Sequence, residues 1–171
     1  MLFSQRIIDA INQQIGNEFS AMLQYTAIAA HFESETLPEL ARFFKRQAEE
    51  EKEHAHRFIQ YLVDIGAKVV IPAIGAPIHS FNFAEDAVKL SLEQEKQVTA
   101  QVNQLVHIAK EEKDYTSDNF LQWFVSEQLE EVASMEDLLR IVQRAGEGNL
   151  LRVEDYLARK GPSHPAEGDE S

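Results

Sequence analysis

The segment between residues 66 and 82, GAKVVIPAIGAPIHSFN, constrains the fold more than any other part of the sequence. Its two prolines and two glycines exclude a continuous helix. On both sides of it, apolar residues recur at steps of three and four, the pattern of helices with one buried face. This pattern predicts helices over about residues 4–33 and 37–65 before the segment and over 83–111, 116–145 and 149–160 after it.

The length of this segment determines the expected topology. A helix of 28 residues is about 42 Å long, and 17 extended residues span at most about 56 Å. The segment can therefore return along the whole bundle, so that the third helix runs parallel to the second. The short links elsewhere predict antiparallel hairpins. The sequence thus predicts an all-α four-helix bundle with one long crossover connection between helices two and three, plus a short fifth C-terminal helix.

Local signals suggest where the helices begin and end. Thr36 and Glu39 have the spacing of a capping box, and Asn82 and Glu85 repeat it before the third helix. Gly66 and Gly146 stand where C-terminal caps belong. The apolar residues of the crossover predict either cover by another subunit or packing on its own bundle, and the sequence does not separate the two. We expect one domain over residues 1–160 and a flexible polar tail over 161–171.

Composition excludes several classes of function. The 171-residue chain has no cysteine, which removes disulfides, thiolate zinc sites and iron–sulfur clusters. Its net charge of −13 disfavours nucleic acid as a partner. The N-terminus lacks the pattern of a signal peptide, and no run of eighteen apolar residues occurs, so neither secretion nor a membrane span is expected. We expect a cytoplasmic protein.

Polar residues interrupt the buried face near the middle of every long helix. Glu18 falls between Ile15 and Met22, and Glu51 falls between Ala48 and Ala55. The other residues at this level are His54 on the second helix, Glu95 on the third, and Gln128 and Glu131 on the fourth. Mid-helix positions lie at one level of a bundle whichever way the helices run. We therefore expect these side chains to converge on one point.

The spacing of these residues repeats within the chain. Glu18 precedes Glu51 by 33 residues and His54 follows three later, while Glu95 precedes Gln128 by 33 and Glu131 follows three later. This is the arrangement that holds two metal ions inside a bundle. Buried carboxylates without partners cost several kcal/mol each, and two divalent cations would neutralise them. The oxygen-rich donor set suits iron or manganese.

Each residue also has a simpler interpretation. A single glutamate on a buried face is often partly exposed, and a lone histidine is often a core residue, but four acids at one level favour metal binding. Tyr25, one heptad after Glu18, is either a core residue or a hydrogen-bonding or redox group. The flanking acids Glu50, Glu127 and Glu130 form either a solvated face or a third, weaker metal site that shares Glu131. We expect the remaining histidines to be surface or structural residues: His31, His56, His79, His107 and His164.

Four segments, NEFSAMLQY, QAEEEKEH, LEQEKQV and NFLQWFVSEQLEE, resemble the ligand-bearing segments of bacterial non-haem ferritins. The resemblance covers about residues 1–160 and implies a ferroxidase centre. It implies a first iron site at Glu18, Glu51 and His54, and a second at Glu51, Glu95 and Glu131, with Gln128 close by and Tyr25 behind the ligands. It also implies a third site, whose residues are Glu50, Glu127, Glu130 and Glu131.

The same resemblance implies a homo-oligomeric shell of 24 subunits. Such a shell oxidises Fe(II) with dioxygen or hydrogen peroxide and stores ferric oxyhydroxide mineral. Haem is not expected, because Lys52 stands where bacterioferritins carry a haem-ligating methionine. Two alternatives stay open: a passive metal-binding cage without fast oxidation, and a di-iron oxidase acting on another substrate. The bulky residues Phe58, Phe124 and Met135 leave no evident substrate cavity for the second alternative.

Overall fold

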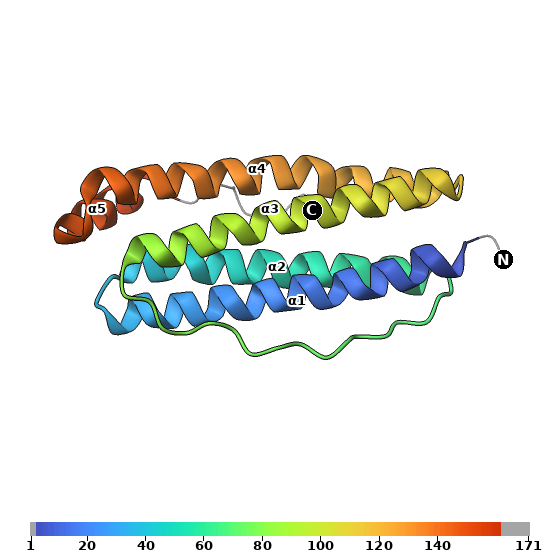
Figure 1. The fold of residues 1–171 in the computed structure, drawn as a ribbon, viewed down its shortest axis with the longest axis horizontal. Coiled ribbons are helices and arrows are strands. Elements are labelled where there is room, and N and C mark those ends of the chain that lie inside the picture. The colour runs from blue at the N-terminus through green and yellow to red at the C-terminus, as the bar shows by residue number, and fades with distance from the viewer. Residues whose placement is uncertain (1–2, 162–171) are drawn as a thin grey trace, which may run out of the picture.

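The computed structural model describes residues 3–161, which fold into a four-helix bundle with a short C-terminal helix (Figure 1). Over these residues the structure is all-α, with no strand, as predicted. The helices are α1 (Gln5–Ser34), α2 (Pro38–Asp64), α3 (Ala84–Glu111), α4 (Tyr115–Ala145) and α5 (Leu150–Lys160), with a 3₁₀ turn, η1 (Glu147–Asn149), before α5. None of the described helices is long and apolar enough to cross a membrane. The predicted flexible tail lies outside the described residues, except for Gly161.

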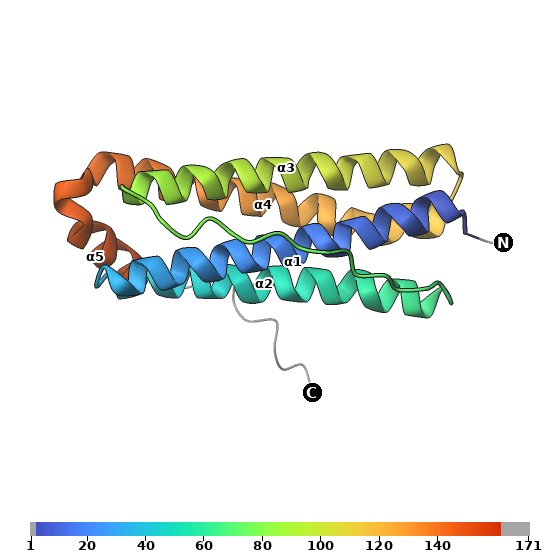
Figure 2. The same cartoon turned by 60° about the horizontal axis from the view of Figure 1, so that its bottom comes forward.

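The crossover connection has the predicted topology. It leaves the end of α2 and returns along α1 to the opposite end of the bundle, so that α3 runs parallel to α2 (Figures 1 and 2). Asn12 and Gln24 of α1 hold its backbone. Asn12 donates to the carbonyl of Lys68 at 3.0 Å and accepts from the amide of Val70 at 2.7 Å. Gln24 donates to the carbonyl of Ile78 at 2.7 Å and accepts from its amide at 3.0 Å.

Its own bundle covers only one side of the crossover. Val70, Ile71 and Ile78 remain 50%, 52% and 54% exposed. The sequence left open whether the crossover packs on its own bundle or is covered by another subunit. These two possibilities concern different sides of the same segment. Helix α1 covers one side, and the outward side is an apolar strip without cover in the single chain.

Gly16 of α1 allows the crossover to approach closely. A Cβ atom at this position would lie 2.3 Å from Cγ of Pro72. We expect Gly16→Ala to lower the free energy of unfolding by about 1–3 kcal/mol, because the clash outweighs the helix propensity that alanine adds. Urea denaturation measures this change. Gly75→Ala is the matched control, since a Cβ there would meet nothing within 4 Å. Equal stability of the two variants would contradict the prediction.

The predicted capping box before α2 is wrong. Thr36 has a left-handed backbone (φ 59°), and the N-cap is Leu37, whose side chain makes no capping hydrogen bond. The carboxylate of Glu154 in α5 replaces it, accepting from the amides of Glu39 at 2.9 Å and Leu40 at 2.8 Å. A residue distant in sequence thus accepts hydrogen bonds from two free backbone amides in the first turn of α2.

The capping signal before α3 is also wrong. Helix α3 follows Phe83 as N-cap, without a side-chain cap, and the amide of Glu85 donates to the carboxylate of Glu147 at 3.1 Å. Asn82 therefore does not cap α3. Asp114, which the sequence reading passed over, caps α4 by accepting from the amide of Ser117 at 2.9 Å.

The predicted glycines at the other helix ends are confirmed. Gly66 follows the C-cap of α2 with φ 72°, and Gly146 is the C-cap of α4 with φ 75°. Both positive angles favour glycine, because it has no Cβ to clash with the backbone.

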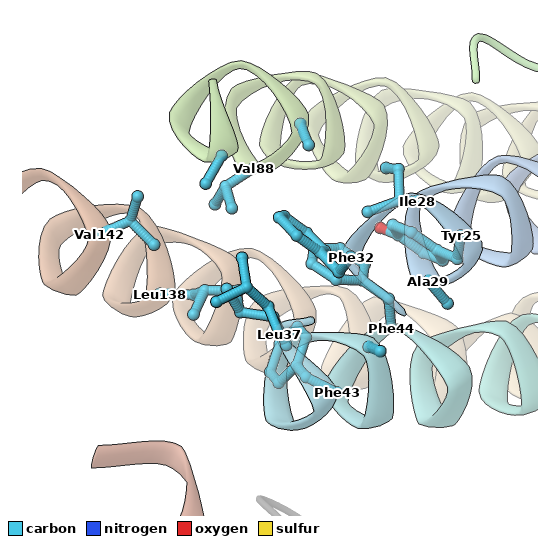
Figure 3. Close-up of a cluster of buried hydrophobic side chains, with 14 of the residues drawn as sticks. Tyr25, Ile28, Ala29, Phe32, Leu37, Phe43, Phe44, Val88, Leu138 and Val142 are labelled. Carbon is cyan, nitrogen blue, oxygen red and sulfur yellow. The ribbon is translucent and has the colours of Figure 1, made fainter. Parts of the chain in front are cut away.

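The core consists of two apolar clusters, one toward each end of the bundle. One contains Tyr25, Ile28, Phe32 and Phe44, and Figure 3 shows it with Val88, Leu138 and Val142 from the second hairpin. The other contains Ile7, Ile11, Ile15, Phe58, Leu62, Leu105, Leu121 and Phe124. The predicted polar level lies between them along each helix. Water is therefore excluded from that level at both ends.

Candidate metal centre

All four long helices contribute buried polar side chains to the middle of the bundle. Their exposed fractions lie between 0 and 3%, for Glu18, Glu51, His54, Glu95, Gln128 and Glu131. Charged residues are rarely buried to this degree unless they are paired. The helical spacing explains the position, because each residue replaces one apolar residue on the buried face of its helix.

Glu18, Glu51 and His54 form the first ligand cluster. One ligand atom from each lies within 4.8 Å of the other two. Nδ1 of His54 is 3.3 Å from Oε2 of Glu51 and 3.8 Å from Oε2 of Glu18. Gln14 donates to the other oxygen of Glu18 at 2.8 Å, which leaves Oε2 directed toward His54.

Glu95 is held by two side chains that the sequence placed nearby. The hydroxyl of Tyr25 donates to Oε1 of Glu95. Nε2 of Gln128 donates to Oε2 of the same carboxylate at 3.1 Å. Tyr25 is fully buried and packs on Phe44 with ring centroids 5.7 Å apart. Its position therefore suits the predicted hydrogen-bonding role behind the ligands.

Glu131 lies between the first cluster and the flanking acids. With His54 and Glu127 it forms a second group whose ligand atoms lie within 4.8 Å of one another. Glu50, half-buried, adjoins Glu131 closely enough to affect its titration. Glu130 is exposed. Of the residues predicted for a third site, the structure brings Glu50 and Glu127 to Glu131 and leaves Glu130 toward solvent.

Most of these buried groups have at least one polar atom without a hydrogen-bond partner. Within residues 3–161, the buried side-chain atoms without a partner include Oε2 of Glu18, Oε2 of Glu50, both oxygens of Glu51, Nδ1 of His54 and Oε1 of Glu131. Although Nδ1 of His54 lies near Glu51, the geometry is not that of a hydrogen bond. Buried polar atoms are normally satisfied. Unsatisfied oxygens from several helices that share one site are what a cation site requires.

Burial shifts the acid pKa values at the centre upward. Burial and the neighbouring Glu131 raise the pKa of Glu95 to about 7. Burial and the neighbouring Glu50 raise the pKa of Glu131 to about 8. Burial, together with Glu95, also raises the pKa of Glu51 well above its ordinary value. Without cations, these carboxyls therefore hold protons near neutral pH.

The pKa values of Glu18 and His54 shift as expected for an ion pair, since that of the acid falls and that of the base rises. Burial alone would lower the pKa of His54, but the carboxylates of Glu18 and Glu51 outweigh it and raise this pKa well above 6.5. Burial would raise the pKa of Glu18, yet His54 and Glu51 lower it below 4.5. Both shifts favour a proton on His54 beside ionised Glu18, and a cation that bound this histidine would release that proton.

Two glutamines at the centre were missed by the sequence reading. Gln14 bonds Glu18, and Gln47 donates to Oε2 of Glu131 at 2.8 Å. A signal for both was available, because they precede Glu18 and Glu51 by four residues each and are themselves 33 apart. Their spacing therefore follows the same repeat as the ligands.

Trp123 also has a place that the sequence did not suggest. The ring centroids of Trp123 and His54 lie 5.5 Å apart, edge to face. The guanidinium of Arg57 lies over the Trp123 ring, 3.8 Å from its centroid. Trp123 therefore packs against a candidate ligand and limits how the imidazole can turn.

The remaining described histidines lie away from the centre. His56 and His79 are exposed, and His107 pairs with Glu111 at 3.1 Å. His31 is half-buried against Phe81. His164 lies outside the described residues.

Comparisons with known proteins agree on one family. A family model described as "Ferritin-like domain" matches residues 8–145. The chain is 45% identical to "Ferritin BfrB" of Mycolicibacterium smegmatis over 150 residues, which cover 88% of this chain and 82% of that protein. It is 36% identical to "Bacterial non-heme ferritin" of Staphylococcus aureus strain MRSA252, over 85% of this chain and 88% of that protein.

Solved structures give the same result. An open pore ferritin from the archaeon Archaeoglobus fulgidus superimposes with a TM-score of 0.88 at 31% identity, over 91% of this chain and 98% of that chain. A structure described as a humanized archaeal ferritin gives a TM-score of 0.90 at 30% identity, over 95% and 99% of the two chains.

Proposed function

Because the chain belongs to the ferritin family, we propose that it stores iron and oxidises Fe(II) to Fe(III) at a di-iron centre inside each subunit. The observation that carries the proposal is the set of buried carboxylate oxygens and one imidazole nitrogen that lack partners in the middle of the bundle. Two divalent cations would neutralise this set. Hard oxygen donors also stabilise Fe(III) more than Fe(II), which favours oxidation.

The proposed ligand sets share one residue. Glu18, Glu51 and His54 would bind one iron substrate ion, and Glu51 with Glu95 and Glu131 would bind the other. Both oxygens of Glu51 are without partners, which supports a bridging role. The pair of Fe(II) ions supplies one electron each to dioxygen or hydrogen peroxide.

The protein's own contribution is to orient the ligands and exclude water. Gln14 and Gln47 each hold one oxygen of Glu18 and Glu131 and leave the other without a partner, while Gln128 holds one oxygen of Glu95. Tyr25 donates to Glu95. Burial and the carboxylate of Glu95 raise the pKa of Tyr25 well above its ordinary value, so its hydroxyl keeps the proton. Catalytic roles for Tyr25 and Gln128 are part of this proposal.

The flanking acids support a third, weaker iron site. Glu127 and Glu131 with His54 form a group of ligand atoms within 4.8 Å, and Glu50 adjoins them. Glu130 lies at the solvent side. We include all four acids in the proposed third site, with Glu131 shared between it and the pair.

Assembly into a shell is supported by the uncovered apolar strip. Its residues Val70, Ile71 and Ile78 are 50–54% exposed, and Val63 and Phe83, beside the two ends of the crossover, are each 55% exposed. A second copy of the chain would cover such a surface. The number of 24 subunits, the mineral, a cytoplasmic location and the absence of haem stay predictions.

Loading Fe(II) without oxygen and then admitting air tests the proposal. We expect two Fe(II) ions per subunit to bind first and then to oxidise much faster than Fe(II) in buffer, followed by soluble ferric mineral in a particle of constant protein mass. Rapid-mixing absorbance and particle mass with iron content measure these steps. Binding without faster oxidation would support the passive cage instead. Consumption of an organic substrate alone would support the di-iron oxidase.

A further inference from the structure

A polar cavity of about 160 Å³ lies between α1 and α3, outside the proposed ligand sets. Its polar wall consists of Asn17, Ser20, Gln94, Gln97 and Gln101. None of its seven lining residues carries a charge, although the chain as a whole has a net charge of −13. The volume has room for several water-sized molecules.

The cavity lies at the level of the metal centre. Asn17 directly precedes Glu18 in the sequence, and Gln94 directly precedes Glu95. The two apolar lining residues, Ala21 and Val98, lie one turn after these same glutamates and are 1% and 3% exposed. They form the inner wall, and the alanine is the smaller of the two.

A short chain of hydrogen bonds connects the cavity wall with a candidate ligand. Nδ2 of Asn17 donates to Oε1 of Gln14 at 3.1 Å. Nε2 of Gln14 donates to Gln101 at 3.3 Å and to Glu18 at 2.8 Å. Gln14 is 2% exposed and does not line the cavity. It therefore couples two lining residues directly to the carboxylate of Glu18.

One lining group lacks a partner. Nε2 of Gln94 is buried and has no hydrogen-bond acceptor. Within residues 3–161, every other buried side-chain atom without a hydrogen-bond partner belongs to a glutamate or to His54. This amide has no acceptor among the protein atoms, so it can donate to a small acceptor that enters the cavity.

The chemistry of the wall identifies the kind of molecule it suits. Amides and hydroxyls offer donors and acceptors together but no net charge. Cations are better attracted on the other side of the centre, where Glu50 and Glu127 lie on α2 and α4. A small neutral molecule that both donates and accepts hydrogen bonds fits the wall between α1 and α3. Dioxygen does neither strongly, whereas hydrogen peroxide does both.

We propose that this cavity is the entry site through which hydrogen peroxide reaches the Glu18 and Glu95 side of the centre. The proposal rests on the ferroxidase function above. In the reaction served, two Fe(II) ions each lose one electron, the O–O bond of one hydrogen peroxide breaks, and two protons from solvent complete two water molecules. Iron and oxidant would thus arrive from opposite sides of the bundle.

The test replaces amides of the wall by side chains of equal length. Gln94→Met with Gln97→Met removes donors and acceptors and leaves the charge unchanged. We expect the initial rate of Fe(II) oxidation by hydrogen peroxide, measured without oxygen, to fall about fivefold, as the loss of ordinary hydrogen bonds implies. The rate with dioxygen and anaerobic Fe(II) binding should stay unchanged. Gln60→Met, an exposed glutamine on α2, is the matched control.

A second measurement needs no iron. In crystals of the metal-free wild type, we expect an ordered water that accepts from Nε2 of Gln94, and the double variant should lose it. An empty wild-type cavity would overturn the proposal. So would an unchanged peroxide rate, or equal losses with both oxidants. If the wild type oxidises Fe(II) quickly with neither oxidant, the ferroxidase function itself fails, which is a distinct result.

Discussion

Glu51→Ala is expected to slow the initial oxidation of Fe(II) by about 100-fold or more, because it removes the ligand that we propose both iron ions share. Both oxygens of Glu51 are buried and without partners, so no local hydrogen bond is lost with them. The metal-free variant should therefore keep its fold and its particle mass. Rapid-mixing absorbance gives the rate, and light scattering gives the mass.

Glu53→Ala is the matched control for this experiment. Glu53 lies two residues further along α2, is exposed, and points away from the centre. The same chemical change there should leave the rate within about twofold, since isolated surface charges contribute little. Equal rates for Glu51→Ala and the wild type would show that the ligand assignment is wrong.

The metal-free protein is expected to lose stability as pH rises from about 5 to about 8. Glu95 and Glu131 have folded-state pKa values of about 7 and about 8, above the ordinary 4.5. Between these values the folded chain binds more protons than the unfolded chain, so the free energy of unfolding falls with rising pH. His54, whose pKa is also raised, acts in the same direction. We expect a loss on the order of a few kcal/mol.

Manganese(II) should reverse this dependence, because it binds the ionised carboxylates and stabilises the folded state by mass action. Thermal unfolding at pH 5, 6, 7 and 8, with and without the metal, measures both effects. The general repulsion of an acidic chain also grows with pH, so the control is the double variant Glu95→Gln with Glu131→Gln. It should reduce the pH dependence and weaken the metal effect, while Glu51 and His54 retain part of both. A metal-free wild type that gains stability toward pH 8 would contradict the assigned protonation.

Residue spacing was sufficient to predict the bundle and the level of the centre. Steps of three and four residues define which face of a long helix is buried, so a glutamate in that pattern must face the interior. Glu18 and Glu95 are completely buried for this reason. The crossover was predictable because its length and its prolines leave few routes for the chain.

The helix ends at α2 and α3 were less predictable. A capping box is a local signal, but Glu154 occupies the first turn of α2 from 115 residues away. Thr36 is consequently free to take the left-handed conformation that ends the preceding turn. Long-range contacts of this kind follow from how α5 docks, which no local pattern encodes.

The amide network was only partly predictable. Gln14 and Gln47 share the 33-residue repeat of the ligands, which gives a signal for their presence. Their partners were not predictable, since Gln47 bonds Glu131 of α4 rather than the glutamate one turn away on its own helix. The choice depends on how the two hairpins pack.

The attachment of α5 has a consequence for any assembly that the chain enters. Only Val153 and Glu154 of this helix are buried, and the carboxylate of Glu154 is anchored to two amides at the start of α2. Gly146 and a single 3₁₀ turn join α5 to α4. Val153 is also part of an apolar core cluster, and Leu150 and Leu157 pack against that cluster. A neighbouring subunit that turned α5 would therefore disturb this end of the core and the start of α2 together.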